Sequence, residues 1–173
     1  MNVMFIKQIE ELTERRINNT LFDSDIDDWN INTSVIDQRI MNKEHIIIII
    51  EDEEGNKFGG YVNSKIDKVG GYINDSKSFL FSLVSNGRME GMKKFDIKPR
   101  HAFWLWNQSD DCLFIFGCDG KYLNDICVYK ENYKTESHCN QYSFEYEGIE
   151  NALYGKLYPN RFTPTRIIVI QMK

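Results

Sequence analysis

Three aspartates at alternate positions, Asp23, Asp25 and Asp27, are the residues whose spacing most clearly suggests chemistry. Carboxylates spaced in this way in a turn converge on one centre, as the first oxygen ligands of a calcium-binding loop do. The sequence therefore indicates a candidate site for weak Ca²⁺ binding. The glycine and the glutamate that complete an EF-hand loop are replaced by Asp28 and Ser34. The alternative is a solvated acidic turn whose aspartates accept hydrogen bonds from backbone amides.

The four cysteines are the other reactive side chains, and their spacing forms no metal-binding or redox motif: Cys112, Cys118, Cys127 and Cys139. No two of them form a Cys-x-x-Cys pair, and no histidine lies at a zinc-finger offset from them. We expect four small apolar side chains on or near strands. The alternative, a cysteine-based redox enzyme, would need one thiol whose pKa is lowered by a cation or a helix N-terminus.

The sequence contains no pattern typical of a hydrolase or a nucleotide-binding enzyme. It has neither a Gly-x-Ser-x-Gly elbow nor a glycine-rich phosphate loop. Acidic residues are numerous, but acid–base catalysis needs environments that separate two pKa values, which a sequence does not report, and expected turns and strand faces favour solvated surface residues. We therefore predict a non-enzymatic protein with no catalytic residue and with no cofactor other than the Ca²⁺ considered above.

Two tryptophans are the best candidates for a binding surface. On a strand, Trp104 and Trp106 share one face, whereas Phe103 and Leu105 share the other. We favour burial of the tryptophan face in the core. Exposed beside His101, the same pair would form a protein-binding patch, because tryptophans are common anchors of interfaces.

Length and charge limit the class of protein. A chain of 173 residues and 20.4 kDa is typical of one domain, which we assign to residues 1–173. The net charge of -5 argues against sequence-independent binding to nucleic acid, which needs a basic surface. No apolar run approaches the ~20 residues needed to span a membrane, and Lys7 and Glu10 interrupt the N-terminal segment, which therefore does not resemble a signal peptide. We expect a soluble, cytoplasmic domain without membrane insertion.

Hydrophobic periodicity predicts the elements that position these residues. Apolar residues recur at helical spacing from Val3 to about Asn18, so residues 1–19 are assigned to an N-terminal helix, and a shorter helix is expected over 34–42. The run 46–50 consists of isoleucine alone and predicts a strand buried on both faces in the middle of a sheet. A charged turn connects it to a second strand over 57–62, which completes a hairpin.

Six further strands are expected at short intervals: 78–84, 102–106, 112–117, 126–129, 142–146 and 166–172. Strands that follow one another through turns rather than helices favour antiparallel sheets. We therefore predict an α+β fold in which residues 20–173 form an antiparallel β-sandwich of two sheets, flanked by the N-terminal helix and by short helices.

Several segments carry a family likeness. The sequence Phe-Gly-Gly-Tyr-Val at 58–62, followed by Ser-Phe-Leu-Phe-Ser-Leu at 78–83, resembles the TLDc domain. The aromatic hairpin around 104–116 and the closing segments at 137–139, 151–153 and 161–172 are similar to the same family. Physically, two adjacent glycines within a strand, Gly59 and Gly60, indicate a bulge or a place where another group packs closely.

The resemblance implies a central β-sandwich, in agreement with the periodicity. It also implies a non-enzymatic interaction domain linked to protection against oxidative stress, because members of the family are associated with oxidation resistance. Some members bind and regulate the vacuolar proton-pumping ATPase, so subunits of that pump are the protein partner that the resemblance suggests.

Overall fold

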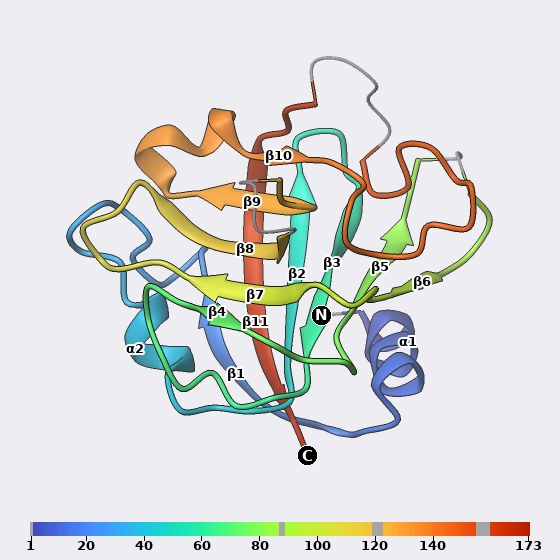
Figure 1. Ribbon diagram of the computed structural model, residues 1–173, viewed down its shortest axis with the longest axis horizontal. Coiled ribbons are helices and arrows are strands. Elements are labelled where there is room, and N and C mark those ends of the chain that lie inside the picture. The colour runs from blue at the N-terminus through green and yellow to red at the C-terminus, as the bar shows by residue number, and fades with distance from the viewer. Residues whose placement is uncertain (1, 87–88, 119–122, 155–159) are drawn as a thin grey trace.

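Two antiparallel β-sheets pack face to face (Figure 1) in the computed structural model, which describes residues 2–86, 89–118, 123–154 and 160–173. The first sheet has six strands in the order β1-β11-β2-β3-β5-β6, and the second has five in the order β10-β9-β8-β7-β4. The predicted α+β sandwich, with an N-terminal helix and a few short helices beside it, is confirmed.

The bounds of the elements follow the order of the sheets. The first sheet contains β1 (Ile17–Asp23), β11 (Pro164–Met172), β2 (Ile46–Asp52), β3 (Lys57–Val62), β5 (Phe79–Val84) and β6 (Lys93–Asp96). The second contains β10 (His138–Cys139), β9 (Ile126–Tyr129), β8 (Cys112–Cys118), β7 (His101–Leu105) and β4 (Tyr72–Ile73). The helices are α1 (Val3–Thr13), α2 (Ile36–Ile40) and the 3-10 helix η1 (Glu131–Glu136). In the described ranges, no helix is long and apolar enough to cross a membrane.

The isoleucine strand β2 has no face toward solvent. Ile46, Ile48 and Ile50 lie in the core between the two sheets. Ile47 and Ile49 lie in a second apolar cluster on the other side of the first sheet. The strand pairs with β11 along one edge and with β3 along the other. The prediction of a doubly buried strand in the middle of a sheet, with a hairpin to the next strand, is confirmed.

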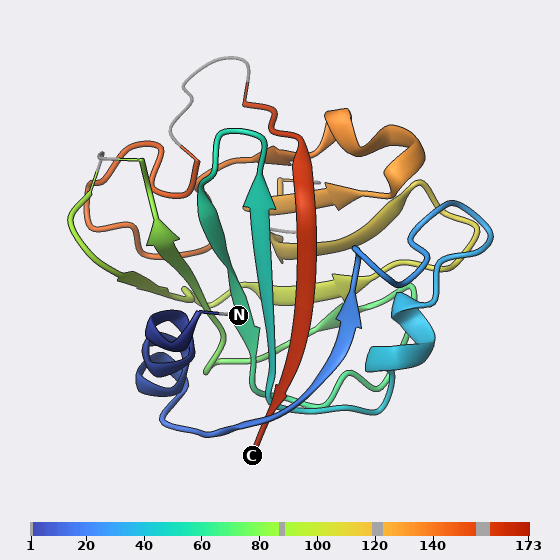
Figure 2. The same cartoon turned by 180° about the vertical axis from the view of Figure 1, so that it is seen from behind.

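Helix α1 covers the side of the first sheet that faces away from the second sheet (Figure 2). Its residues Ile9 and Leu12 pack in the same cluster as Ile47 and Ile49. Side chains three apart on a helix share a face, which explains why these two residues point together toward the sheet. The apolar stripe of the helix is therefore covered by the protein's own sheet.

The helix ends at Thr13, six residues before the predicted end at residue 19. Glu14 adopts a left-handed conformation with φ of 53°, which stops the helical hydrogen bonds. Backbone hydrogen bonds then run in both directions between Arg16 and Lys173. They begin the pairing of residues 17–23 with β11, so this segment forms the edge strand β1, and the predicted continuation of the helix to residue 19 is wrong.

Two other predicted elements differ from the structure. The helix expected over 34–42 is reduced to α2: it begins after Ser34, whose hydroxyl contacts the amide of Ile36 at 3.4 Å, and ends before Asn42, which has a φ of 61°. The strand expected over 142–146 is absent from the described structure. There the buried carboxylate of Asp125 accepts hydrogen bonds from the amides of residues 142 and 143, which holds the segment in an irregular path.

The glycine pair in β3 allows close packing on both faces of the strand. A Cβ atom on Gly59 would overlap the carbonyl oxygen of Ile48, and one on Gly60 would lie 2.5 Å from the ring of Phe116. Phe116 comes from the second sheet and is fully buried. Gly60 therefore lets the second sheet approach the first, and Gly59 lets β3 lie close to the backbone of β2 in the same sheet.

We expect Gly60→Ala to lower the free energy of unfolding by about 1–3 kcal/mol, because the Phe116 ring must shift in a filled core. Gly59→Ala should cost more, since the overlapping atom belongs to the backbone of the central strand. Ser82→Ala on the neighbouring strand is the control: its buried hydroxyl has no partner in the described structure, so its removal should leave stability unchanged or raise it. Urea denaturation of the three variants measures this order, and a Gly59 variant as stable as the wild type would contradict it.

Candidate functional site

The outward side of the second sheet carries a continuous row of side chains. Residues that lie directly opposite each other on paired strands share one face of a sheet. The register places Tyr72 opposite Trp104, Trp104 opposite Ile115, Ile115 opposite Cys127, and Cys127 opposite His138. The residues that alternate with them, such as Phe103 and Phe114, lie in the core. We call this row the outer row. In Figure 1 strands β7, β8 and β9 face the viewer, and no helix of the described chain crosses them.

The two tryptophans lie beside each other on this side of the sheet. The ring centroids of Trp104 and Trp106 are 5.1 Å apart, and both side chains are only half-buried. Phe103 and Leu105 point the other way, into the core. Burial of the tryptophan face in the core, the interpretation favoured from the sequence, is therefore wrong. Trp29, in contrast, is 4% exposed and belongs to the core.

The indole nitrogens of Trp104 and Trp106 are buried and have no hydrogen-bond partner in the described structure. A buried donor without an acceptor costs about 1–3 kcal/mol. Around them the surface is aromatic: the ring of Tyr72 meets Trp104 edge-on at 4.5 Å and stacks on His101 at 4.2 Å. The result is an aromatic surface above two buried donors that have no partner in the described structure, and tryptophan and tyrosine are enriched among the residues that anchor interfaces.

A hollow of about 560 Å³ adjoins this surface at the N-terminal end of β7, and its ionisable lining residues include Asp75, Lys98, Arg100 and His101. Asp75 accepts three backbone hydrogen bonds, at 2.6 Å from residue 63, 3.0 Å from residue 64 and 3.0 Å from residue 77. The Nδ1 atom of His101 lies 2.7 Å from the side-chain oxygen of Asn74. The lone pairs of Asp75 therefore hold the backbone in place, and this lining provides no pair of carboxylates for acid–base catalysis.

Two other buried ionisable groups also serve the fold. The ammonium of Lys130 donates hydrogen bonds to the carbonyl oxygens of Asn107 at 2.8 Å, Gln108 at 2.6 Å and Asp110, which closes the loop between β7 and β8. Burial lowers the pKa of Lys130 and raises the pKa of Asp125. In the described structure Lys130 bonds to backbone carbonyl groups, and Asp125 accepts hydrogen bonds from backbone amides and from the hydroxyl of Tyr146, so both hold the fold together.

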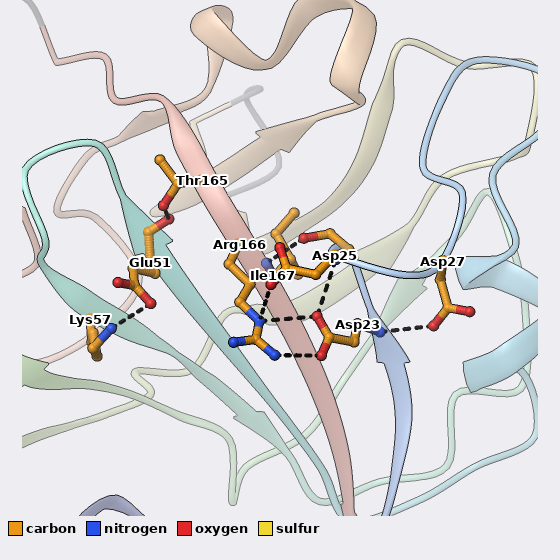
Figure 3. Close-up of polar contacts among 9 residues, drawn as sticks. Asp23, Asp25, Asp27, Glu51, Lys57, Thr165, Arg166 and Ile167 are labelled. Carbon is orange, nitrogen blue, oxygen red and sulfur yellow. Dashed lines mark hydrogen bonds and ion pairs between the residues drawn. The ribbon is translucent and has the colours of Figure 1, made fainter. Parts of the chain in front are cut away.

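The acidic turn predicted as a calcium site is held by arginine (Figure 3). The guanidinium of Arg166 on β11 contacts both carboxylate oxygens of Asp23, at 3.1 and 2.7 Å, and the carboxylate of Asp25 at 3.1 Å. Asp27 accepts a hydrogen bond of 2.9 Å from the amide of Asp23 and lies 3.4 Å from Arg39. Hydrogen bonding to Arg166 holds the pKa of Asp23 below its usual range.

These contacts agree with the alternative interpretation, in which the three aspartates organise a turn. In the part of the chain that the structure describes, no three side chains of the metal-binding types are grouped to hold an ion. A cation at the turn would have to displace Arg166 from both Asp23 and Asp25. The prediction that Ca²⁺ binds there stays a prediction.

The cysteines occupy different environments. Cys139 lies in the core, where burial raises the pKa of its thiol, and Cys118 donates a hydrogen bond of 3.2 Å to the hydroxyl of Tyr72. The sulfur atoms of Cys112 and Cys127 lie 3.8 Å apart on neighbouring strands. The sequence does not predict this pair, because 15 residues separate its members and no motif marks their spacing.

Replacement of Arg166 by glutamine should lower the free energy of unfolding near neutral pH by about 0.5–1 kcal/mol. The side chain of Arg166 is 40% exposed, so solvent screens the ion pair and keeps its contribution small. Because the pKa of Asp23 is lowered in the folded state, the stabilisation is present above the unfolded pKa of about 3.9 and is lost as the pH falls through the folded value. Denaturation at neutral pH and in acid measures the difference between the two proteins, which should vanish in acid.

Arg39→Gln is the matched control, because Arg39 makes a single and longer contact with Asp27. It should cost less than the Arg166 variant at neutral pH. A difference between wild type and Arg166→Gln that persists unchanged in strong acid would show that Arg166 acts through packing rather than through the carboxylates.

A calcium titration followed by thermal unfolding tests the cation prediction. A ligand at a hundredfold excess over its Kd stabilises the folded state by about 2.7 kcal/mol. With Arg166 in contact with two of the three carboxylates, we expect millimolar Ca²⁺ to leave the melting temperature unchanged. A rise that depends on concentration and disappears in Asp25→Asn would establish the cation site instead.

The comparisons with known proteins complete these observations. The family model described as TLDc domain matches residues 2–155 of the chain. No curated protein matches the chain.

Proposed function

This chain belongs to the TLDc domain family, and from that premise we propose that it is an interaction domain that binds subunits of the vacuolar proton-pumping ATPase. The family is one of domains related to oxidative stress, and it is generally non-enzymatic. In this proposal the chain contributes to stress protection through a surface that recognises another protein, and it acts without catalysis in a cytoplasmic location.

The observation that carries the proposal is the aromatic surface around Trp104 and Trp106. Tryptophans supply large contact areas and are enriched among the residues that dominate binding energies. These two lie on the outward side of the second sheet, whose strands β7, β8 and β9 no described helix crosses in Figure 1, and their indole nitrogens have no acceptor among the described residues. An interface that rotates either ring toward a carbonyl group of the partner would satisfy a donor that the free protein leaves unsatisfied.

The charge of the chain indicates the chemistry of the partner. With a net charge of -5, the protein is attracted to surfaces with an excess of lysine and arginine. We therefore expect the partner to present an apolar or aromatic depression for the tryptophans, surrounded by basic side chains.

The N-terminal helix is the competing contact surface. Its apolar stripe is covered by the first sheet, where Ile9 is completely buried. Val3 and Met4 near its start are 68% and 56% exposed, which leaves a small apolar area at one end. The helix lies on the opposite side of the sandwich from the tryptophans (Figures 1 and 2). The two surfaces can therefore be tested separately.

We expect the double variant Trp104→Ala and Trp106→Ala to lose binding to purified pump subunits in a pull-down under reducing conditions at physiological salt. Removal of an anchoring tryptophan costs about 2 kcal/mol or more in typical interfaces, which corresponds to a loss of affinity of roughly thirtyfold or more. The matched control is Met4→Ser on α1, which should bind as the wild type does.

Two outcomes would contradict the proposal. Wild-type protein that recovers no pump subunit would argue against this partner. Loss of binding in Met4→Ser with retention in the tryptophan variant would move the interface to the helix. Circular dichroism of each variant shows whether the fold is intact, because the tryptophans lie outside the core and their removal should not unfold the domain.

A further inference from the structure

Two thiols meet on the outward side of the second sheet. Cys112 begins β8, and Cys127 lies in β9 as a member of the outer row. Their sulfur atoms are 3.8 Å apart, which is van der Waals contact for sulfur. None of the four cysteines forms a disulfide in the described structure.

An irregularity of the strand pairing brings these side chains together. Cys112 lies opposite Tyr129, and the register shifts between Cys112 and Phe114, so that Ile115 comes to lie opposite Cys127. Leu113, which lies between Cys112 and Phe114, points into the core. A bulge of this kind bends the strand and re-aims the side chain beside it. Here it directs Cys112 diagonally toward Cys127.

The environments of the two thiols differ. Cys112 is half-buried, whereas Cys127 is 3% exposed. Hydrogen bonding from Cys127, and to a smaller extent from Tyr129, lowers the pKa of Cys112, while burial opposes this change. The same contact with Cys112, together with burial, raises the pKa of Cys127, and burial raises the pKa of Tyr129 to about 12. Cys112 is thus the accessible sulfur that more readily becomes a thiolate, and Cys127 is the protonated sulfur behind it.

We propose that Cys112 and Cys127 form a reversible disulfide when the protein meets a hydroperoxide such as hydrogen peroxide. The thiolate of Cys112 attacks one peroxide oxygen; an S–O bond forms, the O–O bond breaks, and hydroxide leaves and takes up a proton to become water. The sulfur of Cys127 then attacks the sulfenic acid of Cys112; the S–S bond forms, the S–O bond breaks, and a second water leaves with the proton of Cys127. Two thiols are oxidised by two electrons, and one peroxide is reduced to two waters.

The structure allows the last step with small movements. A disulfide has an S–S distance of about 2.0 Å, so the two sulfurs must approach by about 1.8 Å from their separation of 3.8 Å. Rotation of Cys112 about χ1 at the end of its strand supplies part of this change, and the bulge supplies a place where the backbone can adjust. Reduction by a cellular dithiol would return both thiols by attack on the sulfur of Cys112, which is the more accessible of the two.

The other cysteines provide internal controls. Cys139 is buried in the core, where the high pKa of its thiol disfavours the reactive thiolate. Cys118 is buried and bonded to the hydroxyl of Tyr72. A double variant, Cys118→Ser and Cys139→Ser, retains only the proposed pair, and the complementary variant, Cys112→Ser and Cys127→Ser, removes it.

The experiment exposes the reduced wild-type chain and these variants to hydrogen peroxide, blocks free thiols, and identifies disulfide-linked peptides by mass spectrometry. We expect the wild type and the variant with only Cys112 and Cys127 to lose two hydrogen atoms, to give one linked peptide pair and to recover fully with dithiothreitol. The variant without the pair should form no intramolecular disulfide. Cys127→Ser alone should accumulate sulfenic acid on Cys112, which a dimedone probe captures, because the second thiol is missing.

Three results would overturn the proposal, and the wild-type measurement alone can give the first two. These are a sulfinic or sulfonic acid on Cys112 without any disulfide, and a disulfide that links other cysteines. The third is a Cys127→Ser variant with no sulfenic acid on Cys112, which would remove Cys112 as the attacking sulfur. None of these readouts depends on binding to a pump subunit, so this proposal can fail or succeed independently of the proposed partner.

Discussion

A strand without a solvent face is the constraint on which this structure depends. The five isoleucines of β2 alternate between the two sides of the first sheet, so both sides must be covered by apolar groups. The second sheet covers one side, with Phe116 packed against Gly60, and helix α1 covers the other side with Ile9. Burial of a side chain such as isoleucine contributes about 1.5–3 kcal/mol, so this strand contributes much of the stability of the domain.

The same arrangement explains where a partner can bind. Helix α1 covers the first sheet, but no described helix covers the second sheet on its outward side. Trp104 and Trp106 lie there in a surface that includes both half-exposed rings and the proposed redox pair, Cys112 and Cys127. Three buried or half-buried ionisable groups of the described structure, Lys130, Asp75 and Asp125, hold loops and turns. The proposed function therefore rests on the exterior of the sandwich.

Much of the fold could be predicted from the sequence, because long apolar runs leave few alternatives: the run 46–50 can only be a doubly buried strand. Strand β1 could not be predicted, since its Asn18 and Asn19 resemble the end of a helix and only pairing with β11 makes them part of a sheet. The short strands β4, β6 and β10 have too few residues to show an alternation. The candidate site, too, could be predicted only in part. Strand alternation correctly placed Trp104 and Trp106 on one face, but which face points inward depends on how the other sheet packs. The contact between Cys112 and Cys127 depends on a bulge, which the sequence does not mark.

Radical footprinting of the intact chain, alone and with pump subunits, tests the central claim most directly, because it reports the solvent exposure of each side chain. The account predicts that Trp104 and Trp106 react in the free protein and become protected in the complex, while Met4 on α1 reacts equally in both. Protection confined to α1 or to the turn around Asp25, with the tryptophans unchanged, would contradict the claim that the outward side of the second sheet is the functional surface.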